Sequence, residues 1–212
     1  MNPKTLRHLT RADKTMARLI QKVGPCTLEA KRTSAAGVPW PFAALVETIT
    51  YQQLTGRVAA TIFARVKALF PDRAFPTPEE LREIPEAQLR GAGLSRAKTA
   101  ALKDIAEKTL AGVVPAPREL EAMEDAEIIR RLTQIRGVGP WTVNMLLMFR
   151  LGRPDILPAT DYGVRKGFAL VYGWKELPTP AELLEFGEKW RPYRTTASWY
   201  LWRALDALDQ EP

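Results

Sequence analysis

Apolar residues along this chain recur every three or four positions, which is the spacing of one face of an α-helix. The clearest stripes lie within residues 42–49, 58–69, 128–135 and 202–208. We find no alternation of apolar and polar residues long enough to predict a β-strand of more than a few residues. The pattern therefore predicts an all-α fold built from many short helices.

Two Thr-Pro pairs mark the beginnings of further helices. Thr77 and Thr179 are each followed by proline, and a glutamate stands three positions after each threonine. A threonine hydroxyl accepts a hydrogen bond at the N-cap, proline suits the first helical position, and the glutamate completes a capping box. The 17 prolines of the chain also suit short helices with sharp corners. We therefore expect helices to begin directly after Thr77 and Thr179.

A Gly-Val-Gly sequence at residues 137–139 joins two short predicted helices, and the proline-containing segments 113–118 and 151–159 are expected to be loops. Glycine permits a left-handed backbone and a close approach by another chain. Pro140 suits the first position of the helix that follows. The N–H groups at the start of a helix form an anion site, so these residues indicate a phosphate-binding hairpin. The alternative interpretation is a helix–turn–helix connection without a ligand.

The charge of the chain points to a polyanionic partner. Its 212 residues are 46% apolar, and 31 lysines and arginines against 24 acidic residues give a net charge of +7, with a pI of about 9.7. Cys26 is the only cysteine, which excludes a disulfide framework and a four-cysteine cluster, and we expect it to fill the core. His8 is the only histidine; we expect it on the surface, so the sequence does not favour histidine-based catalysis.

No apolar run approaches the length of a membrane span, and the first residues lack the apolar core of a signal peptide. We therefore expect a cytoplasmic location, with association with the nucleoid if the source is bacterial.

Asp161 stands at the end of the loop 151–159, directly before a predicted helix at residues 162–171. Taken alone, it is typical of a helix N-cap. A carboxylate without a partner base also suits cleavage of an N-glycosidic bond, because it stabilises the positive charge that develops on the sugar. A helix N-terminus favours the ionised carboxylate, so the two roles are compatible.

Residues 132–168, LTQIRGVGPWTVNMLLMFRLGRPDILPATDYGVRKGF, resemble the helix-hairpin-helix DNA glycosylases, most closely their alkyladenine branch, the 3-methyladenine DNA glycosylase II type. The resemblance extends over about residues 10–208. It implies a single glycosylase domain over residues 1–212, with two α-helical lobes, a cleft between them, and the hairpin and catalytic loop within about residues 125–168. It implies a monomeric enzyme of base excision repair that flips alkylated purines, such as 3-methyladenine and 7-methylguanine, out of damaged double-stranded DNA and hydrolyses their N-glycosidic bonds.

The resemblance also implies roles for individual residues. Asp161 matches the catalytic aspartate, and Trp141 stands where strand-cutting relatives carry a lysine that forms a Schiff base, so no lyase activity is expected. Met145 replaces the aromatic residue usual at its position. Core packing is the alternative for the aromatic residues. The residues implied for the base pocket are Tyr51, Trp141, Met145, Tyr162 and Trp202.

Contacts to DNA are implied for the hairpin and for the segment that matches the family's wedge, where Gln53 stands at the matching position. A polar helix end and solvated surface charges are the alternatives. The candidate DNA-binding residues are Gln52, Gln53, Leu54, Arg136, Gly137, Val138, Gly139, Thr142, Arg165 and Lys166. Main-chain carbonyls of Thr133, Ile135 and Val138 are implied to hold Na⁺ or K⁺. No cofactor is expected to be required, and no iron–sulfur cluster is expected.

Two other functions remain open from the sequence. One is a non-catalytic DNA-binding protein that uses the hairpin as a clamp, and the other is a structural or partner-binding helical domain with no role in binding nucleic acid. Release of methylated purines from alkylated DNA distinguishes the enzyme from the clamp. Salt-dependent binding to duplex DNA distinguishes both from the third function.

Overall fold

The computed structural model describes residues 3–28 and 40–208. Within these ranges the regular structure consists of thirteen α-helices, one π-helical turn and one 3₁₀ helix, without a strand. The all-α prediction is therefore confirmed. No helix in this part of the chain has the length and apolar character needed to cross a membrane.

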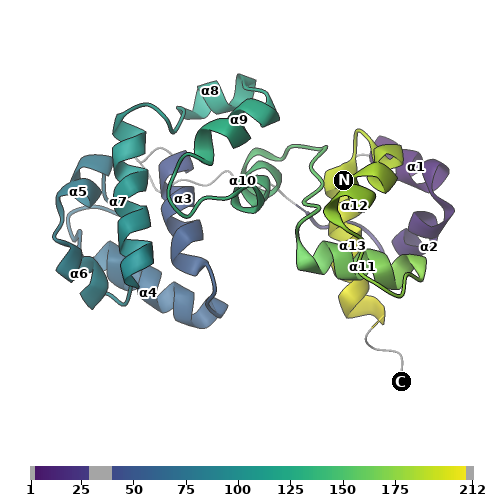
Figure 1. The fold of residues 1–212 in the computed structure, drawn as a ribbon, viewed down its shortest axis with the longest axis horizontal. Coiled ribbons are helices and arrows are strands. Elements are labelled where there is room, and N and C mark those ends of the chain that lie inside the picture. The colour runs from purple at the N-terminus through teal and green to yellow at the C-terminus, as the bar shows by residue number, and fades with distance from the viewer. Residues whose placement is uncertain (1–2, 29–39, 209–212) are drawn as a thin grey trace. The chain divides into compact units, whose positions relative to one another are not determined.

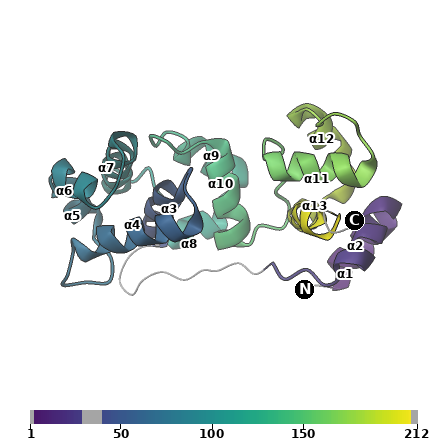
Figure 2. The same ribbon diagram turned by 90° about the horizontal axis from the view of Figure 1, so that it is seen from below.

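The chain divides into two compact units, which the colours of Figures 1 and 2 help to follow. Arg32–Val143 forms one, which we call the central unit. Met1–Lys31 and Asn144–Pro212 together form the other, which we call the terminal unit. The boundary falls within a helix, directly after the hairpin residues, so the hairpin and Asp161 belong to different units.

The central unit is built around α7, which packs against α3 and α5 (Figure 1). Its helices are α3 (Trp40–Tyr51), α4 (Gly56–Ala68), α5 (Pro78–Glu83), α6 (Glu86–Gly91), α7 (Arg96–Leu110), α8 (Pro117–Ala122), α9 (Asp125–Leu132) and the beginning of α10 (Pro140–Leu146). The predicted stripe on α3 is confirmed, since all four of its apolar residues are buried. The stripe at residues 58–69 is confirmed in part, because Val66 is buried and Ile62 and Leu69 are half-buried, whereas Val58 is 48% exposed and its neighbour Ala59 is buried.

The terminal unit joins the two ends of the chain, with α13 packed against α2 and α11 (Figure 1). Its elements are α1 (Pro3–Ala12), α2 (Lys14–Val23), the end of α10, the π-helical η1 (Leu147–Leu151), α11 (Tyr162–Tyr172), α12 (Pro180–Phe186), the 3₁₀ helix η2 (Gly187–Trp190) and α13 (Arg194–Leu208). Phe168, Trp190 and Tyr200 are fully buried in its core.

The predicted helix starts at Thr77 and Thr179 are confirmed. Each threonine accepts a hydrogen bond from the backbone N–H three residues later, and each glutamate side chain accepts one from the threonine backbone. The capping box therefore fixes the beginnings of α5 and α12 from local sequence alone.

Two glycines on one face of α11 permit an unusually close helix contact. A methyl group built on Gly167 would overlap the main-chain carbonyl of Leu201 on α13. Gly163 lies one turn earlier and faces the side chain of Trp202. The absence of side chains here brings the backbones of α11 and α13 together, which places Trp202 beside the first turn of α11.

Candidate active site and nucleic-acid interface

Asp161 caps the N-terminus of α11, as its place in the sequence predicts. Its Oδ1 accepts a hydrogen bond of 2.8 Å from the backbone N–H of Val164 and another of 2.8 Å from Nε1 of Trp202. The residue is partly exposed to solvent. A helix amide and an indole N–H thus both donate to one oxygen of this carboxylate at the surface of the terminal unit.

Trp202 is held in place from two sides. Its ring stacks on Phe149, with ring centroids 5.9 Å apart and an interplanar angle of 25°. On the other side, a Cβ atom on Gly163 would lie 3.0 Å from Cδ1 of Trp202 and 3.2 Å from Oδ1 of Asp161. Gly163 therefore leaves the space in which the indole and the carboxylate meet.

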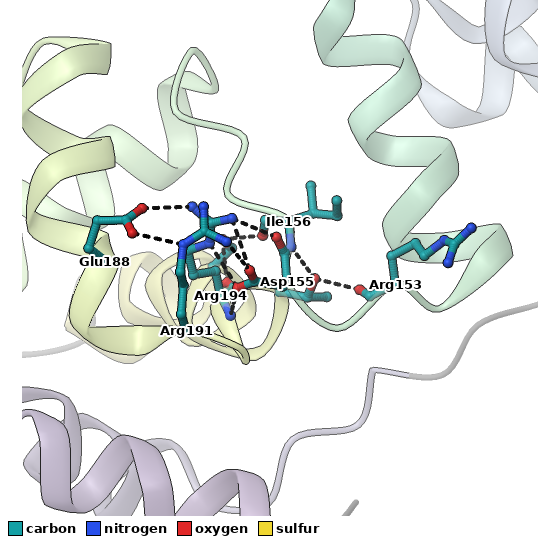
Figure 3. Close-up of polar contacts among 8 residues, drawn as sticks. Arg153, Asp155, Ile156, Glu188, Arg191 and Arg194 are labelled. Carbon is teal, nitrogen blue, oxygen red and sulfur yellow. Dashed lines mark hydrogen bonds and ion pairs between the residues drawn. The ribbon is translucent and has the colours of Figure 1, made fainter. Parts of the chain in front are cut away.

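The loop before Asp161 is tied to the beginning of α13 (Figure 3). Nε of Arg194 donates to Asp155 at 2.8 Å, and Nη1 of Arg191 donates to the same carboxylate at 2.7 Å. The hydroxyl of Thr195 accepts the backbone N–H of Ile156 at 2.9 Å. Because α13 also carries Trp202, one helix positions both the loop and the indole that contact Asp161.

The hairpin between α9 and α10 has the tight turn that its glycines predict. Gly137 has a φ of +78°, whereas Gly139 is not among the residues with positive φ. Pro140 is the first residue of α10, as expected. The backbone N–H of Arg136 donates to Oδ2 of Asp104 on α7 at 2.7 Å, which anchors the hairpin to the core of the central unit.

Gln52 connects the hairpin to the turn that follows α3. Its Nε2 donates to the carbonyl of Gly137 at 3.1 Å and lies 3.4 Å from Oγ1 of Thr142. Nζ of Lys98 donates to the carbonyls of Thr50 at 2.8 Å and Gln52 at 2.7 Å. Burial lowers the pKa of the Lys98 ammonium group. The sequence reveals none of these contacts, because each joins residues that are far apart along the chain.

Gln53 is the only residue other than glycine with a positive φ in the described part of the chain, at +56°. A left-handed backbone is costly for a residue with a side chain, and such strain often marks a functional position. Gln53 is exposed, and the neighbouring Leu54 is 38% exposed. Of the three candidates for the wedge, Gln52 therefore has contacts inside the unit, whereas Gln53 and Leu54 face solvent.

A cavity of about 610 Å³ opens in the central unit beside this turn. It is lined by Glu47, Thr48, Tyr51, Gln52, Gln53 and Trp141. Trp141 is 40% exposed, which is unusual for so large an apolar ring. Sequence reasoning named Tyr51 and Trp141 as pocket residues but missed Glu47, although Glu47 precedes Tyr51 by one helical turn.

The other predicted site residues vary in exposure. Tyr162 is 64% exposed, and Met145 is half-buried. Nε of Arg165 donates to the carbonyl of Pro178 at 2.7 Å, while Arg136 and Lys166 are exposed. The side chains of Val138 and Thr142 are buried, so these two residues offer a ligand mainly their backbone. The candidates in the terminal unit are Met145, Asp161, Tyr162, Arg165, Lys166 and Trp202, and the rest lie in the central unit.

The hairpin carbonyls implied to hold an alkali cation are neutral oxygen donors, which suit a hard cation. Thr133 is the C-cap of α9, where helix carbonyls lack partners within the helix. The Ile135 carbonyl accepts the Val138 N–H at 3.0 Å and retains a second lone pair. The residues present therefore fit such an ion.

Residues 46–192 match the model of the HhH-GPD superfamily of base excision DNA repair proteins. The chain belongs to this superfamily. It is 37% identical over 206 residues to DNA-3-methyladenine glycosylase 1 of Schizosaccharomyces pombe, covering 95% of this chain and 87% of that protein.

Solved structures of this superfamily share the fold. The S. pombe 3-methyladenine DNA glycosylase Mag1 in complex with abasic DNA matches with a TM-score of 0.83 over 99% of this chain and 100% of that chain, at 37% identity. DNA-3-methyladenine glycosidase of Bacillus halodurans matches with a TM-score of 0.86 over 99% of this chain and 92% of that chain, at 33% identity.

Proposed function

We propose that this protein is a monofunctional, monomeric DNA glycosylase that removes alkylated purines of the 3-methyladenine and 7-methylguanine type from damaged duplex DNA. The observation that carries the proposal is the carboxylate of Asp161, which is partly exposed and held by a helix amide and an indole N–H. Its place in a chain of this superfamily, with relatives named 3-methyladenine DNA glycosylases, supports the assignment.

Hydrolysis of the N-glycosidic bond needs one carboxylate when the base is already cationic. The bond between C1′ and the purine nitrogen breaks, its electron pair leaves with the base, and positive charge develops on the sugar. The negative charge of Asp161 stabilises that charge, with an effect of about 3–4 kcal/mol for a group placed in this way. A water oxygen then bonds to C1′, and its proton passes to the carboxylate. The products are a free neutral base and an abasic site.

Trp141 accounts for the absence of strand cutting in this proposal. A lysine amine at this position would form a Schiff base with the sugar, and an indole has no such nucleophile. An exposed indole face also attracts a cationic base, with a contribution of roughly 0.5–2 kcal/mol. The carboxylate of Glu47 in the same cavity adds a charge of the complementary sign.

The hairpin and Gln53 bind and distort the DNA in this proposal. The N–H groups at the start of α10 donate hydrogen bonds to a backbone phosphate. Gln53, held outward by its left-handed backbone, fills the gap that the extruded base leaves.

We also propose that the carbonyls of Thr133, Ile135 and Val138 hold Na⁺ or K⁺. When bound, the ion adds positive charge beside the phosphate and fixes the turn. Duplex affinity is then higher in potassium chloride than in tetramethylammonium chloride of equal ionic strength. Equal affinity in the two salts would contradict this assignment.

The proposal is tested by incubating purified protein with methylated duplex DNA and identifying the released bases by chromatography. We expect 3-methyladenine and 7-methylguanine to appear, the strand to stay intact, and no covalent adduct to be trapped by borohydride. The Asp161→Asn protein, purified in parallel, controls for contaminating glycosylase. Binding to duplex DNA without release of any base would favour the non-catalytic clamp instead.

A further inference from the structure

The terminal unit contains a second cavity of about 610 Å³, between α1 and the residues just before α13. One wall carries Lys4, Arg7, His8 and Arg11, and Pro192 and Tyr193 contribute to the other. No acidic side chain is among the residues that line it. None of these residues contacts Asp161 through a hydrogen bond described above, so the cavity is a separate feature of the unit.

The basic residues of α1 form one continuous stripe. Lys4, Arg7, His8 and Arg11 follow the spacing of a single helix face, and the opposite face buries Thr5 and Leu9. Like charges one turn apart repel, and a lysine in the first turn opposes the helix dipole. The first turn of α1 carries no acidic residue to offset these charges. A bound anion would offset the repulsion between Arg7 and Arg11.

Arg7 and Arg11 lack ion-pair partners among the residues that the structure describes. Other arginines of the same unit are paired: Arg191 and Arg194 both contact Asp155. Arg7 and Arg11 are also both exposed, so their guanidinium groups are accessible from solution. A guanidinium group binds phosphate through two parallel hydrogen bonds, and a pair of arginines on one helix face suits a tetrahedral anion.

We propose that this cavity is a phosphate-binding site, and that its occupant is a phosphate of the DNA backbone. The inference rests on the proposed function in one respect, because the duplex is the substrate assigned there. It adds a contact that neither the hairpin nor the Asp161 region supplies. Its contribution is to affinity and to binding of undamaged DNA, because a phosphate contact does not report base identity.

The first test measures how duplex affinity depends on salt. Each protein–phosphate contact contributes about 0.9 to the slope of log affinity against log salt concentration. Arg7→Ala combined with Arg11→Ala removes this one phosphate contact and is expected to lower that slope by about one. The matched control is Lys14→Ala combined with Arg18→Ala, which removes the same charge from exposed positions on α2 that do not line the cavity. An equal decrease in both double variants would indicate net charge alone and overturn the site.

The second test uses His8, which is the only histidine of the chain and lines the cavity. Its ring packs edge-on against Tyr193, with ring centroids 5.4 Å apart. Its imidazole proton resonances in a protein without a histidine tag therefore report on this cavity alone. We expect undamaged duplex DNA to shift them in wild type and in the Lys14/Arg18 control but not in the Arg7/Arg11 variant. A shift with inorganic phosphate at matched ionic strength, but none with duplex, would overturn the DNA assignment. No shift with either would overturn the site.

Base release distinguishes failure of this inference from failure of the proposed function. The single-turnover rate of base release at saturating protein is expected to be unchanged by the Lys14/Arg18 control substitutions. If wild type releases alkylated bases but both double variants bind DNA alike, only the phosphate site is wrong. If wild type binds no duplex at all, both proposals are wrong.

Discussion

Two aspartates of the terminal unit each cap the N-terminus of a helix, but their surroundings differ. Asp13 caps α2 and Asp161 caps α11, and each accepts a hydrogen bond from the backbone N–H three residues later. Each also accepts a hydrogen bond from an indole: Trp190 donates to Asp13 at 3.1 Å, and Trp202 donates to Asp161 at 2.8 Å. The two caps therefore share the same backbone donor position and the same type of side-chain donor.

The side chains of Asp13 and Asp161 differ in how far they are buried. The side chain of Asp13 is 5% exposed, and both its oxygens are used inside the unit: Oδ1 accepts backbone N–H groups, while Oδ2 accepts the hydroxyl of Tyr172 at 2.7 Å and lies 3.6 Å from Nζ of Lys189. Asp161 is partly exposed, and the bonds from Val164 and Trp202 both go to Oδ1. The Asp13 carboxylate is thus buried in the core of the unit, whereas the Asp161 carboxylate is partly exposed to solvent.

The two caps also differ in the residue that stands two positions after the aspartate. Two positions after Asp13 stands Thr15, and two positions after Asp161 stands Gly163. Without a side chain at Gly163, the indole of Trp202 reaches the same oxygen as the helix amide. Gly163 in the first turn and Trp202 from a distant helix therefore decide which groups the Asp161 carboxylate meets.

Asp161→Asn is expected to give the largest effect. The amide keeps an oxygen that can cap α11 but loses the negative charge, so base release from methylated DNA falls by about a thousandfold. Duplex affinity and the free energy of unfolding stay close to wild type. Asp206→Asn, on the exposed face of α13, is the control for loss of a surface charge. Release at the wild-type rate would show that Asp161 is only a cap.

Gly163→Ala is expected to slow base release by about 10- to 100-fold, because small misplacements of a catalytic group have effects of this size. The added methyl group would stand 3.2 Å from Oδ1 of Asp161 and 3.0 Å from the Trp202 ring, so one of them must move. We expect kcat to fall with KM unchanged. Gly91→Ala serves as the control, because no heavy atom lies within 4 Å of its Cβ position. A fall in KM and kcat together with loss of fold stability would instead indicate a packing role.

Asp13→Asn is expected to lower the free energy of unfolding by about 1–3 kcal/mol at neutral pH, without changing the rate of base release at temperatures where the protein is folded. Burial alone would raise the pKa of Asp13, but hydrogen bonds from Tyr172, the Met16 amide and Trp190, with the charge of Lys189, leave it lowered.

The pH dependence of the free energy of unfolding provides a second test of the role of Asp13. Because the folded pKa of Asp13 is lowered, its ionisation contributes stability above the unfolded pKa and loses it as pH falls through the folded value. Denaturant unfolding of wild type and Asp13→Asn should therefore converge as the pH is lowered below about 4. A constant difference across that range would show that the stability of Asp13 does not depend on its charge.

Local signals in the sequence predicted much of the fold. The capping boxes at Thr77 and Thr179, the start of α10 at Pro140 and the cap at Asp161 all depend on residues within one helical turn, and all are confirmed. The stripe on α3 was also correct. Such features need only propensity and short-range hydrogen bonds, which a sequence displays directly.

Contacts between segments that are distant along the chain were not predicted from the sequence. Trp202 was assigned to the base pocket, and its bond to Asp161 joins residues 41 positions apart. His8 was expected at the surface, yet it is half-buried against Tyr193. The left-handed Gln53 gave no local signal either, since its conformation is imposed by the turn that Lys98 binds. Each depends on tertiary packing that brings separate helices together.

The contact between Gly167 and the Leu201 carbonyl has an evolutionary consequence. Backbone meets backbone there, so the spacing of α11 and α13 does not depend on the size of any side chain. The residues around the Trp141 cavity lie in the other unit and can be exchanged without disturbing this junction. Under the proposed function, selection can therefore alter the residues that contact the lesion without changing the helix spacing that places Trp202 beside Asp161.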